Sequence, residues 1–156
     1  MKKILFIAFI ALTAFTTTAQ ENLTWHTDMN KAVAISAEQN KPIFLFFTGS
    51  DWCGWCIRLQ KEVFHKPDFE KWAKENVILV ELDFPRKTKL TPELQQQNYS
   101  LSQTFNVKGY PTVWFVSPEK KEDGKVNLKA LGKTGYVAGG PEKWLSVANG
   151  ILETKN

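Results

Sequence analysis

The chain has 156 residues, a hydrophobic content of 43% and a formal net charge of +4. This composition supplies enough apolar side chains for one sizeable core, which excludes a largely disordered protein. The charge falls to about +2 without Lys2 and Lys3, and so small a balance does not favour nucleic-acid binding. The length suits one domain with a short appendage.

The N-terminal segment has the pattern of a secretory signal peptide. Its two lysines form a positive start, residues 4–14 are apolar, and residues 17–19 (TTA) offer a small-residue cleavage site. A membrane span needs about 20 apolar residues, and this apolar run is shorter, so an uncleaved membrane anchor is the less favoured interpretation. We expect residues 1–19 to be removed. Residues 20–156 are then expected to form one exported domain, periplasmic or secreted, with no stable membrane insertion.

Apolar periodicity and turn residues predict the elements that follow, in chain order. We expect helices at 28–40, 53–64, 69–76, 92–105 and 141–152, and strands at 43–48, 77–83, 112–116 and 126–131. A basic loop is predicted at 84–91 and the polar turn of a hairpin at 117–125. The runs IFLFFT and VILVELD are typical of strands buried on both faces of a sheet. This order predicts an α/β fold with a central mixed β-sheet and helices on both faces.

The two cysteines of the chain, Cys53 and Cys56, lie three positions apart. A disulfide between them closes a very small ring, which stabilises a fold little, so we expect it to serve chemistry. Cys53 begins a predicted helix, where free N–H groups and the helix dipole favour a thiolate. Cys56 lies one turn later and can attack a mixed disulfide formed at Cys53. We therefore predict thiol–disulfide exchange, with Cys53 exposed and attacking and Cys56 buried and resolving.

Other uses of the cysteine pair were weighed against the same residues. Zinc needs about four ligands, and neither histidine has a metal-like spacing to the pair, so we predict no metal centre. Haem attachment needs a histidine directly after the second cysteine, where this chain has Ile57. No organic cofactor motif is present. Two alternatives stay open, namely a module that binds peptides over Trp52, Trp55 and Tyr110 without its thiols, and a Cu(I)-binding thiol pair.

Two motifs resemble the thioredoxin superfamily. They are Trp52-Cys53-Gly54-Trp55-Cys56, after an apolar strand, and Gly109-Tyr110-Pro111-Thr112, before the next strand. The resemblance covers about residues 25 to 153 and implies the thioredoxin fold, with Pro111 in cis against the cysteine pair. It also implies that the backbone of Tyr110 pairs with an extended substrate segment. The implied site has Cys53 and Cys56 as catalytic residues and Trp52, Gly54, Trp55, Tyr110 and Pro111 as substrate-binding residues.

The chain is also similar to exported thioredoxin-like proteins with a GSDWCGWC-type site, and to the C-terminal thioredoxin domain of the inner-membrane disulfide reductase. The shared features are Lys61-Glu62-Val63-Phe64, Pro67-Asp68-Phe69 and the VILVELD strand. This likeness implies a reductase or electron relay. Its expected partners are disulfide-bonded or thiol-bearing envelope proteins and an upstream thiol electron donor.

Two departures from the thioredoxin pattern bear on the mechanism. Thioredoxin has a buried Asp on the strand before its cysteines, whereas residues 44–47 here contain no acid. Glu81 and Asp83 are candidate substitutes, although solvated or capping roles are the simpler expectation. The central dipeptide is Gly-Trp, so Trp55 and Trp52 are expected to form a docking surface unless Trp52 packs beneath the helix.

Two further expectations concern Asp51 and the remaining tryptophans. Asp51 is expected to be a turn residue, with a modest brake on the acidity of Cys53 as the alternative. The remaining tryptophans are expected in the core, namely Trp25, Trp72, Trp114 and Trp144.

Overall fold

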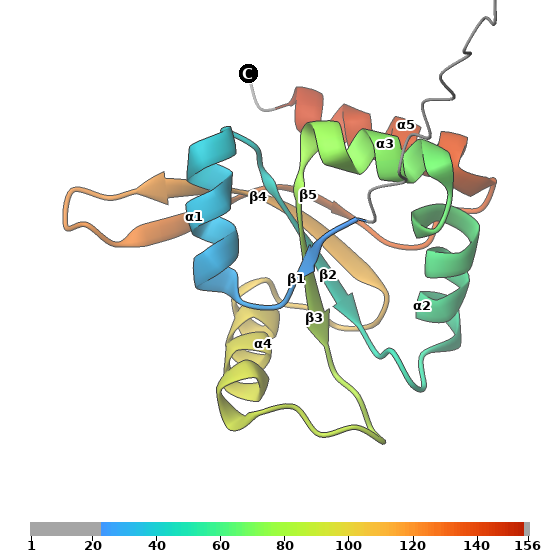
Figure 1. The fold of residues 1–156 in the computed structure, drawn as a ribbon, viewed down its shortest axis with the longest axis horizontal. Coiled ribbons are helices and arrows are strands. Elements are labelled where there is room, and N and C mark those ends of the chain that lie inside the picture. The colour runs from blue at the N-terminus through green and yellow to red at the C-terminus, as the bar shows by residue number, and fades with distance from the viewer. Residues whose placement is uncertain (1–22, 155–156) are drawn as a thin grey trace, which may run out of the picture.

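A computed structural model describes residues 23–154 of the chain (Figure 1). The predicted signal peptide lies outside these residues. The elements are β1 (Trp25–His26), α1 (Met29–Gln39), β2 (Ile43–Thr48), α2 (Gly54–Leu59), the π-helical turn η1 (Gln60–Phe64), α3 (Pro67–Asn76), β3 (Ile78–Asp83), α4 (Pro92–Thr104), β4 (Thr112–Lys120), β5 (Val126–Thr134) and α5 (Gly140–Glu153). Among the described residues, no helix is long and apolar enough to cross a membrane.

One five-stranded sheet has the order β1-β3-β2-β4-β5. The strands β1, β3 and β2 are parallel, while β4 and β5 run antiparallel. The register pairs Thr48 with Asp83 and Phe47 with Thr112. The carboxyl ends of β2 and β3 therefore meet the start of β4 at one edge of the sheet. The predicted mixed sheet is confirmed, and the segment after β2 that carries both cysteines starts from this edge.

Each face of the sheet buries a separate apolar cluster because side chains alternate along a strand. One cluster joins Phe44 and Phe46 to the cysteines and to apolar residues of α2, η1, α3 and α5. The other joins Leu45 and Phe47 to α1 and to Phe105 after α4. All six residues of β2 are buried, as predicted for a central strand covered on both sides. The helices lie on both faces in Figure 1, as predicted.

Three elements differ from the prediction. The two-residue strand β1 was not expected, and it is held by pairing of Trp25 with Leu79. The hairpin turn was predicted too long, because Ser117–Lys120 continues β4, where Ser117 pairs with Lys129. Polar side chains do not prevent backbone pairing when they face solvent. The predicted helix that starts at the cysteines changes to a π-helical turn over its last five residues.

The tryptophans expected in the core divide into two pairs. Trp144 and Trp72 are buried. Trp25 and Trp114 are only half-buried, so for these two the prediction was wrong in degree. Their rings still pack on core residues, with Trp25 on Phe44 and Trp114 on Phe105.

Candidate active site

The cysteine pair lies at the start of α2, where the chain leaves β2 through a short turn. Cys53 is the N-cap of α2 and is disulfide-bonded to Cys56, with their Cα atoms 5.2 Å apart. The Cys56 N–H donates to the Cys53 sulfur at 3.2 Å. This N–H and the helix N-terminus both favour negative charge on the Cys53 sulfur. Of the two sulfurs, the one that accepts this N–H group belongs to Cys53, which was predicted to be the attacking residue.

The exposure of the two cysteines differs less than expected. Cys56 is fully buried, as predicted, but Cys53 is only 6% exposed and is also classed with the core. Trp52 and Tyr110 are partly buried against the apolar cluster that contains both cysteines. The prediction of an exposed Cys53 was therefore wrong, since the residue is almost completely buried in the disulfide-bonded protein.

The turn before Cys53 depends on Gly49. The carbonyl oxygen of Gly49 accepts the N–H of Cys53 at 2.8 Å. A Cβ at Gly49 would lie 2.5 Å from the Trp52 indole, well inside contact distance. Only glycine leaves room for the Trp52 ring against this turn.

Trp52 packs into the site instead of presenting a free surface. Its indole N–H donates to the Phe84 carbonyl at 2.8 Å, and its ring meets Tyr110 edge-on at 5.8 Å. The guanidinium of Arg86 lies 3.8 Å from the ring centroid, a cation–π contact. The structure favours the packing role that was one of the two expectations for Trp52.

Asp51 fastens the loop between β3 and α4 to the active-site turn. Its carboxylate accepts the backbone N–H groups of Arg86, Lys87 and Thr88, at 2.6 to 3.3 Å. These bonds, the Arg86 N–H foremost, lower the pKa of Asp51. Asp51 is thus a clamp between two segments about 35 residues apart in sequence, a role the sequence did not reveal.

The clamp predicts a pH dependence confined to acid. Because the pKa of Asp51 is lower in the folded protein than its ordinary 3.8, the anchor is complete above that value and is lost as the pH falls through the folded pKa. The backbone amide NMR shifts of Arg86, Lys87 and Thr88 are expected to titrate together with a midpoint below 3.8. In Asp51→Asn this titration disappears and the three amides exchange faster with solvent. A midpoint at or above the ordinary value would contradict the clamp.

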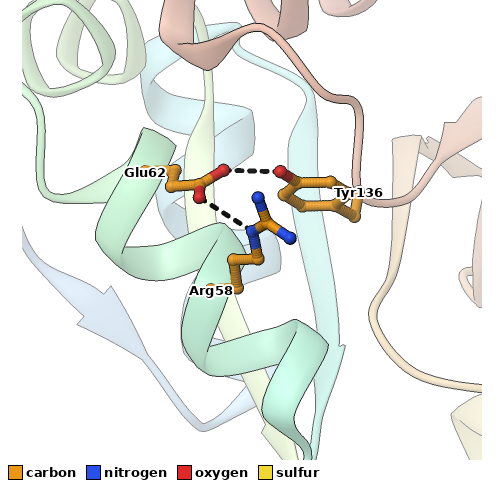
Figure 2. Close-up of polar contacts among 3 residues, drawn as sticks. All are labelled: Arg58, Glu62 and Tyr136. Carbon is orange, nitrogen blue, oxygen red and sulfur yellow. Dashed lines mark hydrogen bonds and ion pairs between the residues drawn. The ribbon is translucent and has the colours of Figure 1, made fainter.

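Trp55 is the exposed tryptophan of the site. Its side chain is 55% exposed, and one side of its ring packs on Tyr136 at 5.1 Å and on the Arg58 guanidinium at 5.3 Å. Figure 2 shows Glu62 joined to both Arg58 and Tyr136. Glu62 accepts from Arg58 Nε at 2.8 Å and from the Tyr136 hydroxyl at 2.5 Å. These bonds lower the pKa of Glu62 and raise the pKa of Tyr136, first through the bond that joins them.

The predicted second motif lies next to the cysteine-bearing turn. The Tyr110–Pro111 peptide is cis, as the resemblance implied. Tyr110 is half-buried, and its ring lies 5.2 Å from that of Phe84 and packs on Trp52. Burial raises the pKa of Tyr110. Gly54 is exposed at the first position of α2, and a Cβ there would meet no atom.

The two acids considered as substitutes for the thioredoxin Asp have different surroundings. Asp83 accepts the N–H and the hydroxyl of Ser50, at 2.8 and 2.5 Å, so it caps the active-site turn. Glu81 is half-buried opposite Phe46 in the register, and burial raises its pKa. Among the described residues no hydrogen bond joins either carboxylate to a cysteine. Asp83 therefore takes the capping role that was the simpler expectation.

Sequence reasoning missed four residues of the site, namely Arg58, Phe84, Arg86 and Tyr136. Arg58 and Glu62 have the i, i+4 spacing of a helical ion pair, which was a usable signal. Phe84, Arg86 and Tyr136 come from segments distant in the sequence, and no local sequence pattern predicts their place in the site. Within residues 23–154 there is no group of three or more His, Cys, Asp or Glu side chains arranged to hold a metal ion.

The fold and the site define a thiol–disulfide oxidoreductase of the thioredoxin fold. The thioredoxin-like domain family matches residues 29–138, and the chain belongs to this family. It is 36% identical over 120 residues to the disulfide bond reductase DsbH of Chlamydia pneumoniae, covering 77% of this chain and 72% of that protein.

Two further comparisons agree with this assignment. The chain is 30% identical to the thioredoxin-related protein DsbJ of Chlamydia pneumoniae over 77% of its own length and 36% of the relative's. A solved structure of a DsbH oxidoreductase superposes with a TM-score of 0.75 at 32% identity, covering 94% of this chain and 95% of that one. The protein is therefore an oxidoreductase of the DsbH and DsbJ type, whose homologues imply thiol-redox partners.

Proposed function

We propose that this protein is a disulfide reductase or electron relay that acts on exported proteins through Cys53 and Cys56. The observation that carries the proposal is the Cys53–Cys56 disulfide at the start of α2 in a chain 36% identical to a disulfide bond reductase. Disulfides form and persist outside the cytoplasm, so exported proteins offer substrates for such a pair.

The reductive reaction balances in two exchanges. The Cys53 thiolate attacks one sulfur of a substrate disulfide, forms a mixed disulfide and releases the other substrate sulfur as a thiolate. Cys56 gives up its proton and attacks the Cys53 sulfur, which releases the second substrate thiolate and leaves the Cys53–Cys56 disulfide. Two electrons pass from the protein dithiol to the substrate. An upstream thiol donor restores the dithiol by the same steps in reverse order.

The surrounding residues support a substrate-binding role. The Tyr110 backbone and Pro111 would align an extended substrate segment by strand addition. Trp55, between the two cysteines in the chain, offers an exposed aromatic ring, and Trp52 and Gly54 flank Cys53 in the sequence. The peptide-binding module without thiol chemistry and the Cu(I) protein remain the alternatives that an experiment must separate from this proposal.

Export and partners follow from the same proposal. The N-terminal pattern of residues 1–19 supports a periplasmic or secreted location. Disulfide-bonded or thiol-bearing envelope proteins would then be the substrates. We expect the mature protein to contain no organic cofactor and to bind no nucleic acid.

The redox potential of the pair tests the proposal. The mature protein is equilibrated in glutathione buffers, and the reduced fraction is measured by alkylation and mass spectrometry. A potential near or below about −200 mV supports a reductase or relay, whereas a value near about −120 mV makes it an oxidant. A pair that never equilibrates contradicts the proposal and returns the function to peptide binding. Retention of one Cu(I) per reduced protein would favour the metal-binding alternative.

A further inference from the structure

The loop between β3 and α4 displays positive charge beside the disulfide. Residues 84–91 (FPRKTKLT) contain three cations and no acid, and Arg86, Lys87 and Lys89 are all exposed. In Figure 1 this loop points toward the turn that leads into α2. The cations therefore stand on the same rim of the molecule as Cys53.

The loop is fixed to the active-site turn at several points. The Asp51 carboxylate holds three consecutive backbone N–H groups, and the Trp52 indole holds the Phe84 carbonyl. Arg86 stacks on the Trp52 ring at 3.8 Å. The backbone that carries the charged side chains is thus held against the active-site turn, so partner binding would cost little entropy in ordering the loop backbone.

These cations have no acidic partner of their own. Among residues 23–154, no carboxylate lies within ion-pair distance of Arg86, Lys87 or Lys89. The charge of Lys87 helps to lower the pKa of Asp51, but the Asp51 oxygens accept hydrogen bonds from backbone N–H groups of the loop. The other rim of the site differs, because Arg58 beside Trp55 is paired with Glu62 at 2.8 Å. The two sides of the site therefore differ, because within the described part of the chain the cation beside Trp55 is held in an ion pair and the three cations of the loop beside Trp52 are not.

A hollow lies under the same loop. Its volume is about 380 Å³, and its polar lining residues are Asp83, Arg86, Thr88, Lys89, Gln95 and Asn98. The one acid among them, Asp83, accepts the N–H and the hydroxyl of Ser50. This concavity, polar and cationic along one wall, has room for a side chain of a docked segment. A carboxylate is the protein group that such a wall would bind.

We propose that residues Arg86, Lys87 and Lys89 bind an acidic segment that flanks the reactive cysteine of the partner protein. This inference rests on the proposed thiol exchange and adds the chemical class of its partner. The charges act on encounter and orientation, so they raise the rate at which the partner disulfide reaches Cys53. The acidic residues of the partner lie on the side of its cysteine that docks against Trp52.

Matched peptide disulfides test the proposal. Three peptides carry the same cysteine as a mixed disulfide with glutathione, flanked by two Glu, two Gln or two Lys residues. Each oxidises the reduced mature protein in a stopped-flow experiment followed by tryptophan fluorescence. At low salt the Glu peptide is expected to react about 3- to 10-fold faster than the Gln peptide, and the Lys peptide more slowly. In 0.5 M salt the Debye length is only about 4 Å, so exposed charges are screened from one another. The ratio of the Glu-peptide rate to the Gln-peptide rate should therefore fall toward one.

Two double variants locate the effect. Lys87→Gln with Lys89→Gln is expected to remove most of the preference and leave the Gln-peptide rate unchanged. Lys120→Gln with Lys121→Gln makes the same change of charge near the tip of the β4–β5 hairpin, which lies on the other side of the molecule from the loop (Figure 1), and should keep the preference. Equal rates for the Glu and Gln peptides, or equal losses in both variants, would overturn the proposal.

A second measurement separates this inference from the proposed function. If the Gln peptide does not react at all, thiol exchange itself has failed. The oxidised protein is then titrated with a cysteine-free form of the Glu peptide, and the amide NMR shifts of Arg86 to Lys89 are followed. Shifts confined to this loop that vanish in Lys87→Gln with Lys89→Gln sustain acidic-segment binding, and an absence of shifts refutes it.

Discussion

Replacing Cys56 with serine is expected to leave the protein covalently joined to its substrate through Cys53, whereas replacing Cys53 with serine abolishes exchange. The buried Cys56 is the group that would release the mixed disulfide, and Cys53, the N-cap of α2, is the group that would form it. Insulin-disulfide reduction should fall to the uncatalysed background in both variants. Only Cys56→Ser should give a substrate adduct on non-reducing gels. An added thiol should reduce the mixed disulfide and remove the adduct.

The control for this prediction is stability, because a loss of fold would also abolish exchange. The ring closed by Cys53 and Cys56 spans a sequence separation of three, so its removal costs little in the chain-entropy picture. Both variants are expected to unfold in urea at the midpoint of the reduced native protein. Retained exchange in Cys53→Ser, or adducts of equal yield in the two variants, would contradict the assigned roles.

The central strands were predictable because a buried strand requires a continuous run of apolar residues in the sequence. The strand β2 is covered on both faces, and a strand in that position must be apolar at every residue. The strand β1 has no such run. It consists of two residues and exists because Trp25 and His26 find β3 beside them, which is a contact across more than 50 positions. The length of the hairpin was missed for the same reason, since pairing with β5 and not local preference extends β4 to Lys120.

The placement of the cysteine pair was equally predictable, but the contacts that support it were not. The CxxC and Tyr-Pro motifs predicted a cysteine pair at the start of a helix and a cis peptide bond, and both are present. The clamp at Asp51 depends on backbone N–H groups 35 to 37 positions away, and backbone N–H groups carry no sequence signal. Tyr136 reaches Glu62 across 74 positions. Supports of this kind come from tertiary structure, and a single sequence contains no local pattern for them.

These supports also explain why the disulfide is so little exposed. On one side Asp51 and Trp52 bind the β3–α4 loop, and on the other Trp55 packs against Tyr136 from the segment after β5. Gly135, directly before Tyr136, lies so close to the Pro111 carbonyl that a Cβ would be 3.1 Å from its oxygen. Three separate segments therefore converge on the CGWC turn, and each is held by a contact outside the reacting atoms.

Trp144→Ala is expected to be among the most destabilising single changes in the protein. The side chain is fully buried, and its ring packs on those of five aromatic residues, namely Phe44, Phe64, Phe69, Trp72 and Phe115. Truncating a buried tryptophan costs about 3–5 kcal/mol through lost transfer energy and the cavity it leaves. Urea unfolding followed by circular dichroism measures this loss of the free energy of unfolding.

Two matched variants divide that loss into its parts. Trp144→Phe keeps an aromatic ring but removes the indole N–H that donates to the Gly135 carbonyl at 3.0 Å, so it is expected to cost about 1–3 kcal/mol. The same bond holds the segment that carries Tyr136, and Trp144→Phe should therefore also change the fluorescence of Trp55, which packs on Tyr136. Val147→Ala on the same helix alters a side chain that is 40% exposed and should cost under about 1 kcal/mol. If Trp144→Ala were no more costly than Val147→Ala, the aromatic cluster would not be the main source of stability on the face of the sheet that carries the disulfide, and the close packing around Cys56 would need another cause.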